Sequence, residues 1–211
     1  MQNSRTQPNP EHNIMTLTGK GQVTAAPDLA ILRLGVQTTG ENLTDIQSEN
    51  ARISQTVLQS LQQLGITDIK TYQYDFNKIY EYEDSRQIDK GYSVRNILEI
   101  RTNNLDLVGS AIDTAVYYGA NIVDLIEFDV SDNQGYYLQA LNLAVENAFQ
   151  KANTIAINLG LSSIPVPIRI IELGTLPVPT RLLGSREGVA PTPIEPGSKQ
   201  IEANVNIDFI Y

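Results

Sequence analysis

The segment 200–211 constrains the fold most, because it follows the two-residue period of a β-strand without a break. Its apolar positions are Ile201, Ala203, Val205, Ile207, Phe209 and Tyr211, and polar residues separate them as far as Phe209. Successive side chains of a strand point to opposite faces, so this pattern predicts a strand with one buried face and one wetter face. The segment is therefore expected to be structural, and its loss costly.

Strand-like stretches occur elsewhere at 14–18, 29–38, 72–82, 91–102, 122–131 and 168–173. The third is rich in tyrosine, and an acidic turn at Glu83 and Asp84 leads from it towards the fourth. Two such strands joined by a short polar turn predict a long antiparallel hairpin.

Three stretches instead carry apolar residues at helical spacing, at 42–64, 105–118 and 133–159. Gly65 is expected to end the first, and Asn103 or Asn104 to cap the second, with Gly119 as its stop. The third would be about 40 Å long. These periods together predict an α+β fold, in which an antiparallel-rich sheet or sheets of about seven to eight strands pack against three helices.

The chain has 211 residues, 41% of them hydrophobic, which suits one core without disulfides. We expect a disordered polar tail at 1–13 and a single domain at 14–211. Within it, 174–197 holds five prolines and four glycines and predicts a long exposed loop. The tail lacks the apolar middle of a signal peptide, so we expect either a cytoplasmic protein or a chain whose leader has been removed.

The charge balance argues against two kinds of partner. Asp and Glu number 24 against 15 Lys and Arg, which gives a net charge of −9 with the cations scattered singly. Nucleic acids and anionic membrane surfaces attract clustered cations, so neither is expected to bind. No run reaches the 18 or so apolar residues of a membrane-spanning helix, so no transmembrane segment is expected.

Common catalytic machinery is missing from the sequence. Cysteine is absent, and the only histidine is His12 in the polar tail. Thiolate nucleophiles, serine triads and zinc sites all need one of these residue types, so we expect no enzyme, no metal and no cofactor.

Two weaker motifs have simpler explanations. Gly19-Lys20-Gly21 resembles a fragment of a phosphate loop, but a strand follows it instead of a helix, so a turn or bulge is expected. Four acids lie close together at Asp124, Glu127, Asp129 and Asp132. Their spacing does not fit a calcium loop, so we interpret them as a solvated strand face.

Aromatic residues give the strongest hint of contact. The third strand carries Tyr72, Tyr74, Phe76, Tyr80 and Tyr82 in phase. Aromatic residues on one strand face are typical of a core, and tyrosine is also enriched at subunit interfaces, so both alternatives stay open. Phe149 on the long helix is a further interface candidate.

In order along the chain, several short motifs resemble the SIMPL-domain family, also called domain of unknown function 541. They are Gly19-x-Gly21-x-Val23, Pro27-Asp28-x-Ala30, Gly91-Tyr92 with Asn96, Gly119-Ala120-Asn121 ahead of Phe128, a helix stepped by Ala140, Ala144, Ala148, Lys151-Ala152 and Ala156 before Gly160-Leu161, and Pro196-Gly197. The resemblance spans about 14–211.

This resemblance implies a bacterial periplasmic or outer-membrane-associated protein. Members are linked to oxidative-stress protection or known as immunogens, some assemble into large homo-oligomers, and no catalytic residue is established for them. We therefore expect an envelope protein that acts by self-assembly. A monomeric module that binds a peptide or small ligand through the 174–197 loop is the first alternative. An enzyme that uses only carboxylates, tyrosines or lysines is the second.

Overall fold

The computed structural model describes residues 13–83, 86–174 and 194–211. They form three helices and seven strands in two antiparallel sheets, which confirms the α+β prediction. Residues 1–12 of the polar tail expected at 1–13, and 175–193 of the loop expected at 174–197, lie outside the described residues. The chain divides into two compact units: unit 1 is built from 1–25, 132–180 and 200–211, and unit 2 from 26–131 and 181–199. The single domain expected over 14–211 stays a prediction.

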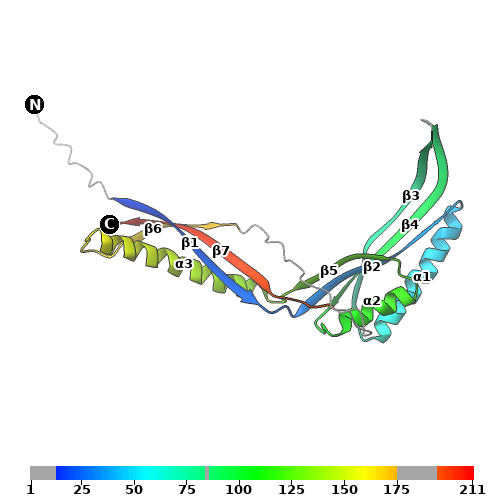
Figure 1. Cartoon of the computed structure of the whole chain (residues 1–211), viewed down its shortest axis with the longest axis horizontal. Helices are drawn as coiled ribbons and strands as arrows, with labels where there is room; N and C mark the ends of the chain where they lie inside the picture. The colour runs from blue at the N-terminus through cyan, green and yellow to red at the C-terminus, as the bar shows by residue number, and fades with distance from the viewer. Residues whose placement is uncertain (1–12, 84–85, 175–193) are drawn as a thin grey trace, which may run out of the picture. The chain divides into compact units, whose positions relative to one another are not determined.

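Unit 1 contains a three-stranded sheet in the order β1-β7-β6. Its elements are β1 (Ile14–Ala25), α3 (Asn133–Asn158), β6 (Val166–Leu173) and β7 (Lys199–Ile210). The strand predicted at the end of the chain is therefore the central strand of this sheet, and α3 runs along the sheet (Figure 1). The alternation of β7 is confirmed, because each of its apolar positions from Ile201 to Phe209 is buried.

A stripe of alanines brings α3 unusually close to β1. Ala140, Ala144, Ala148 and Ala152 are all buried on this side of the helix. A Cβ atom added to Gly19 would lie 1.9 Å from the carbonyl oxygen of Ala144. The expectation of a turn at Gly19 was wrong, whereas the alternative of a bulge stays a prediction. This residue lies inside β1, and it is glycine because the helix backbone occupies the place of a side chain.

Unit 2 contains a four-stranded sheet in the order β3-β4-β2-β5. Its elements are β2 (Leu29–Gly40), α1 (Leu43–Gln63), β3 (Asp68–Glu83), β4 (Arg86–Thr102), α2 (Leu107–Tyr117) and β5 (Ile122–Asp129). The helices cover one face of the sheet, where Leu32, Leu34, Leu61, Ile100 and Phe128 form part of a continuous core.

The ends of α1 agree with the predicted range 42–64 and with Gly65 as the residue that ends the helix. The side-chain oxygen of Asn42 accepts hydrogen bonds from the backbone N–H groups of Thr44 and Asp45, and Gly65 takes a left-handed φ of 85° just after the helix. Inside the helix, fully buried Asn50 donates from Nδ2 to the backbone carbonyls of Val36 at 3.0 Å and Val94 at 3.1 Å. This amide ties α1 to both inner strands.

The start of α2 differs from the prediction. The Nδ2 group of Asn103 donates to the backbone carbonyl of Asp28 at 2.9 Å, so it is not used as a helix cap. Asn104 does not cap the helix either, and α2 begins after Asp106, which makes no side-chain capping bond. Asp28 in turn accepts from the backbone N–H and the hydroxyl of Ser131, both at 2.6 Å. The Pro27-Asp28 motif thereby joins the start of β2 to the segment after β5.

Candidate interaction surface

The exposed aromatic residues of β3 form the most prominent unexplained surface of unit 2. We call Tyr74, Phe76, Tyr80 and Tyr82 the hairpin aromatics; they are exposed to 47%, 62%, 46% and 72%. Such exposure places these rings outside the core, so the core alternative was wrong for them. Large aromatic side chains left in water on one element mark a surface suited to contact.

The register of the sheet explains why these rings are uncovered. β3 pairs with β4 from Asp68 to Glu83, which confirms the predicted hairpin. β3 is an edge strand, and α1 packs on the inner strands β2 and β4. Pairing of β2 with β4 ends at Gly40 and Tyr92, so the outer part of the hairpin continues as two strands alone (Figure 1).

The charges on this ribbon are largely neutralised by one another. Lys78 lies 2.7 Å from a carboxylate oxygen of Asp89, and Lys90 lies 2.7 Å from one of Glu81. The hydrogen bond between Lys78 and Asp89 raises the pKa of Lys78 and lowers the pKa of Asp89. The Lys78 ammonium also lies 5.5 Å from the ring of Tyr80. With its ions paired, the ribbon presents its rings as the feature free to make new contacts.

Tyr72 differs from the other aromatics, because the register shifts between Thr71 and Gln73. Its ring stacks on the guanidinium of Arg33 at 3.6 Å, on the sheet face that the helices leave open. Tyr74 is paired with Asn96 and lies on the opposite face. The expectation that all five aromatics are in phase was therefore wrong for Tyr72, since a bulge turns its side chain around.

A buried carboxylate lies beside this stack. Glu99 is 4% exposed, although it is on the open face of the sheet. It receives hydrogen bonds from Arg33 on β2 and from Arg101 on β4, at 3.1 to 3.2 Å, and its Oε1 lies 3.0 Å from Nζ of Lys70 on β3. Lys70 first, then Arg33 and Arg101, lower the pKa of Glu99 to about 2 against the effect of burial. One ionised carboxylate thus links three strands.

Sequence reasoning missed this cluster. Glu99 and Arg101 lie within the strand predicted at 91–102, but nothing in the sequence marks them as part of a cluster. The pattern that would reveal the cluster runs across strands, because Arg33 on β2 and Lys70 on β3 both lie directly opposite Glu99 on β4. Finding it requires the register, which a single sequence does not supply.

Phe149 is partly buried in unit 1. Its ring meets that of Phe209 edge to face, with centroids 5.2 Å apart, and packs on the core between α3 and β7. Core packing accounts for this aromatic residue, and an interface role for it stays a prediction.

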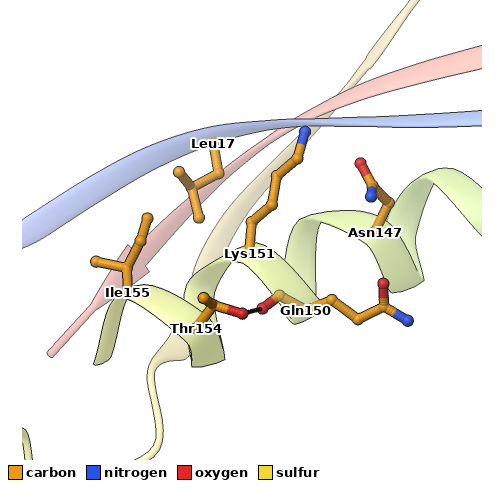
Figure 2. Close-up of a pocket in the computed structure, with 6 residues that line it drawn as sticks. All are labelled: Leu17, Asn147, Gln150, Lys151, Thr154 and Ile155. Carbon is orange, nitrogen blue, oxygen red and sulfur yellow. Dashed lines mark hydrogen bonds between the residues drawn. The ribbon is translucent and has the colours of Figure 1, made fainter. Parts of the chain in front are cut away.

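Unit 1 also has an open depression of about 380 Å³ between α3 and β1. It is lined by Leu17, Asn147, Gln150, Lys151, Thr154 and Ile155 (Figure 2). Lys151 reaches from α3 to β1, where its Nζ donates to the backbone carbonyl of Thr18 at 2.7 Å. Thr154 donates to the carbonyl of Gln150 at 2.8 Å. The lysine therefore has a structural task, because it joins the helix to the strand.

The acidic residues considered as a cation site are dispersed in the structure. Asp124 pairs with Arg95 at 3.1 Å, Asp129 pairs with Lys199, and Asp132 accepts from the backbone N–H of Gly135. Within 13–83, 86–174 and 194–211, no group of three or more acidic, histidine or cysteine side chains is placed to hold a metal ion. None of the helices α1, α2 and α3 combines the length and the hydropathy needed to cross a bilayer.

Comparison with known proteins identifies several that are similar in sequence to this chain. It is 31% identical over 210 residues to the 26 kDa periplasmic immunogenic protein of Brucella abortus (strain S19), an alignment that covers 92% of this chain and 83% of that protein. It is 26% identical over 149 residues to the uncharacterized protein YggE of Escherichia coli (strain K12), which covers 70% of this chain and 61% of YggE. The SIMPL family, described as a protein of unknown function (DUF541), matches residues 15–209, so the chain belongs to the SIMPL family.

Proposed function

We propose that this protein is a non-enzymatic component of the bacterial envelope, and that it acts by assembling with copies of itself through the hairpin aromatics. The observation that carries the proposal is the exposure of four aromatic rings on one edge ribbon. Burying Phe76 and Tyr82 alone, which are 62% and 72% exposed, would remove a large apolar area from water. Tyrosine and phenylalanine are among the residues that most often anchor protein interfaces.

A periplasmic location is proposed from a relative. The Brucella protein, similar over most of both chains, bears the word periplasmic in its name. Fractionation of the native host tests the location: recovery with periplasmic markers supports it, and recovery with cytoplasmic markers contradicts it. The link to oxidative stress stays a prediction, which peroxide survival of a deletion strain would test.

Self-assembly is tested by light scattering on the purified full chain. We expect a mass of several copies at high micromolar concentration, and a shift towards one copy in the double variant Tyr74→Ser, Phe76→Ser. These two rings lie on one face of β3, opposite Asn96 and Val94. Both are exposed, so their removal should not disturb the core.

Tyr117→Ser is the matched control. Tyr117 is 82% exposed at the end of α2, away from the hairpin. Its loss removes as large a ring and should leave the mass unchanged. A strict monomer for the unaltered chain would contradict the proposal, and so would an equal effect of the control and the hairpin variant.

The alternative of a monomeric binding module depends on the 174–197 loop, of which 175–193 lie outside the described residues. Deletion of 175–193 separates the two ideas. Assembly that survives deletion would favour the hairpin aromatics, whereas loss of assembly would show that the contact requires the loop.

A further inference from the structure

Strand β1 lies at an edge of the sheet of unit 1, so one side of its backbone faces no other strand in that sheet. It is twelve residues long, contains no proline, and carries a single charged side chain, that of Lys20. Natural proteins protect such edges with prolines and charges on the strand itself, or by covering them with another element, because an open edge is a template for a further strand. The sequence of β1 supplies little of the first kind of protection.

The pairing of β1 with β7 fixes which backbone groups of β1 point away from the sheet. The backbone N–H of Tyr211 donates to the carbonyl of Asn13 at 3.1 Å. The hydroxyl of Thr18 donates to the side chain of Asn206 at 2.8 Å, in the same antiparallel register. In such a register, residues bonded to the neighbouring strand alternate with residues whose N–H and C=O point away. Asn13 is of the first kind, so Thr18 and Lys20 are of the second.

Two side chains of α3 already occupy these outward groups at the middle of β1. The Oδ1 atom of Asn147 accepts from the backbone N–H of Lys20 at 3.2 Å. The Nζ atom of Lys151 donates to the backbone carbonyl of Thr18 at 2.7 Å. Figure 2 shows both side chains directed from α3 towards the blue strand, which is β1. A donor and an acceptor that a further strand would use are therefore both bonded within this chain.

The spacings of helix and strand allow this double contact. Asn147 and Lys151 lie four positions apart on α3, which is about 6 Å along a helix. Thr18 and Lys20 lie two positions apart on β1, which is about 6.8 Å along an antiparallel strand. Gly19 lies between them, and the helix backbone fills the space of its missing side chain. The close approach at this glycine thus brings two polar side chains of the helix within reach of the edge.

We propose that Asn147 and Lys151 close the β1 edge, so that a strand of another chain is prevented from adding to the sheet there. Such a strand needs the N–H of Lys20 and the C=O of Thr18 for its own ladder. It would have to break both bonds with α3 and displace the two side chains, which opposes its addition. The contact is autoinhibitory, because the fold itself keeps a pairing surface closed. It is independent of the hairpin aromatics, and it leaves the proposed self-assembly to surfaces other than this edge.

The test removes both bonds and asks whether the edge opens. The double variant Asn147→Leu, Lys151→Met keeps side chains of similar size and removes their polar ends. Gln150→Leu, Thr154→Val is the matched control, because these two side chains lie on the same stretch of α3 and are directed away from β1 (Figure 2). The control therefore also replaces two polar side chains by apolar ones, but it leaves the edge bonded.

Both variants are made in a full chain that also carries Tyr74→Ser and Phe76→Ser, so that the hairpin contact is removed. We expect the Asn147→Leu, Lys151→Met chain to associate at high micromolar concentration, and the control to keep the mass of its parent in light scattering. The loss of Lys151 makes the net charge of −9 one unit more negative, which by itself opposes association.

Amide hydrogen exchange locates the contact. In the associated double variant, the backbone N–H groups of Thr18 and Lys20 should exchange at least about tenfold more slowly than in dilute solution, because carbonyl groups of the added strand then protect them. A double variant that stays as monodisperse as the control would overturn the proposal. Association that leaves the exchange of these two amides unchanged would overturn it as well, because the contact would then lie elsewhere.

A conservative variant tests the role of the two bonds. Asn147→Asp with Lys151→Arg keeps an acceptor and a donor at these positions, so we expect it to behave as the control does. Its association would contradict the proposal, since the edge would then open with both kinds of bond retained. If circular dichroism shows that Asn147→Leu, Lys151→Met does not fold, Lys151→Met alone takes its place and is judged by the same results. Failure of the hairpin contact would leave this test valid, and failure of this test would leave the proposed function standing.

Discussion

Substitution of Gly19 by alanine tests the close contact between β1 and α3. The added Cβ would lie 1.9 Å from the carbonyl oxygen of Ala144 and 2.9 Å from the Cβ of Ala148. A Cβ atom essentially never lies within 3.0 Å of a non-bonded heavy atom, so strand and helix must part by about 1.1 Å or more at this point. The obstacle is helix backbone, which cannot turn aside as a flexible side chain would.

The loss of stability follows from that displacement. A gap of 0.5 to 1 Å already removes about a quarter to a half of the dispersion energy of the atoms involved. The alanine stripe of α3 would move away from β1 together with Ala144, because a helix shifts as a rigid element. We expect Gly19→Ala to lower the free energy of unfolding of unit 1 by about 3 kcal/mol, at the upper end of the usual range for overpacking.

Urea denaturation followed by far-ultraviolet circular dichroism measures this loss. With a denaturant dependence of about 2 kcal/mol per molar urea, the midpoint should fall by about 1.5 M. Gly174→Ala is the control, since no atom lies within 4 Å of the place of its Cβ, and its midpoint should change little. A decrease under about 0.3 M for Gly19→Ala would refute the reasoning, because it would mean that β1 and α3 separate at almost no cost.

Three further substitutions probe unit 2. Glu99→Gln should lower the free energy of unfolding by about 1 to 2 kcal/mol at pH 7. A folded pKa of about 2 in place of 4.5 corresponds to at most about 3.4 kcal/mol, and solvent screening of the partly exposed cations lowers that upper limit. Because the pKa of Glu99 is depressed in the folded state, its contribution to stability is present above about pH 4.5 and is lost as the pH falls towards 2. The melting temperature of the variant should therefore depend less on pH in that window. A pH dependence equal to that of the unaltered chain would contradict the ionised state assigned to Glu99. Asn50→Ala should lower the free energy of unfolding, measured by urea denaturation, by about 2 kcal/mol, because two strand carbonyls lose a buried donor, whereas exposed Ser48→Ala should have little effect. The hydrogen bonds from Ser131 hold the pKa of Asp28 below its ordinary value of 3.8. Asp28→Asn should therefore lower the stability near neutral pH, and the stability of this variant should fall less steeply as the pH drops below 3.8. A fall as steep as that of the unaltered chain would argue against those bonds.

Periodicity predicted most of the secondary structure. The alternation that ends at Phe209 is that of a real strand with one buried face, and the helical spacing before Gly65 is that of α1. These patterns succeed because burial is decided locally, by which side chains point to the core. The family resemblance, built from short motifs in order, was confirmed over 15–209.

What failed depends on contacts between segments far apart in the sequence. Gly19 was interpreted as a turn because nothing near it in the chain shows that a helix backbone will pass at that point. Tyr72 was assigned to the wrong face because a bulge is set by pairing with β4. The cationic environment of Glu99 arises only once β2, β3 and β4 are in register. Periodicity describes one segment at a time, and these features each involve two or more.

The position of β7 has a consequence for the order of events as the chain folds. Its sheet is ordered β1-β7-β6, so β1, made first, cannot pair until the last strand has been made. All of the helices and strands of unit 2 are complete long before that point, between β1 and α3. The helices and strands of unit 2 are therefore free to pack together early, while β1 waits as an unpaired strand. The time between the two steps is a period of exposure to proteases and misfolding that any host producing this protein must manage.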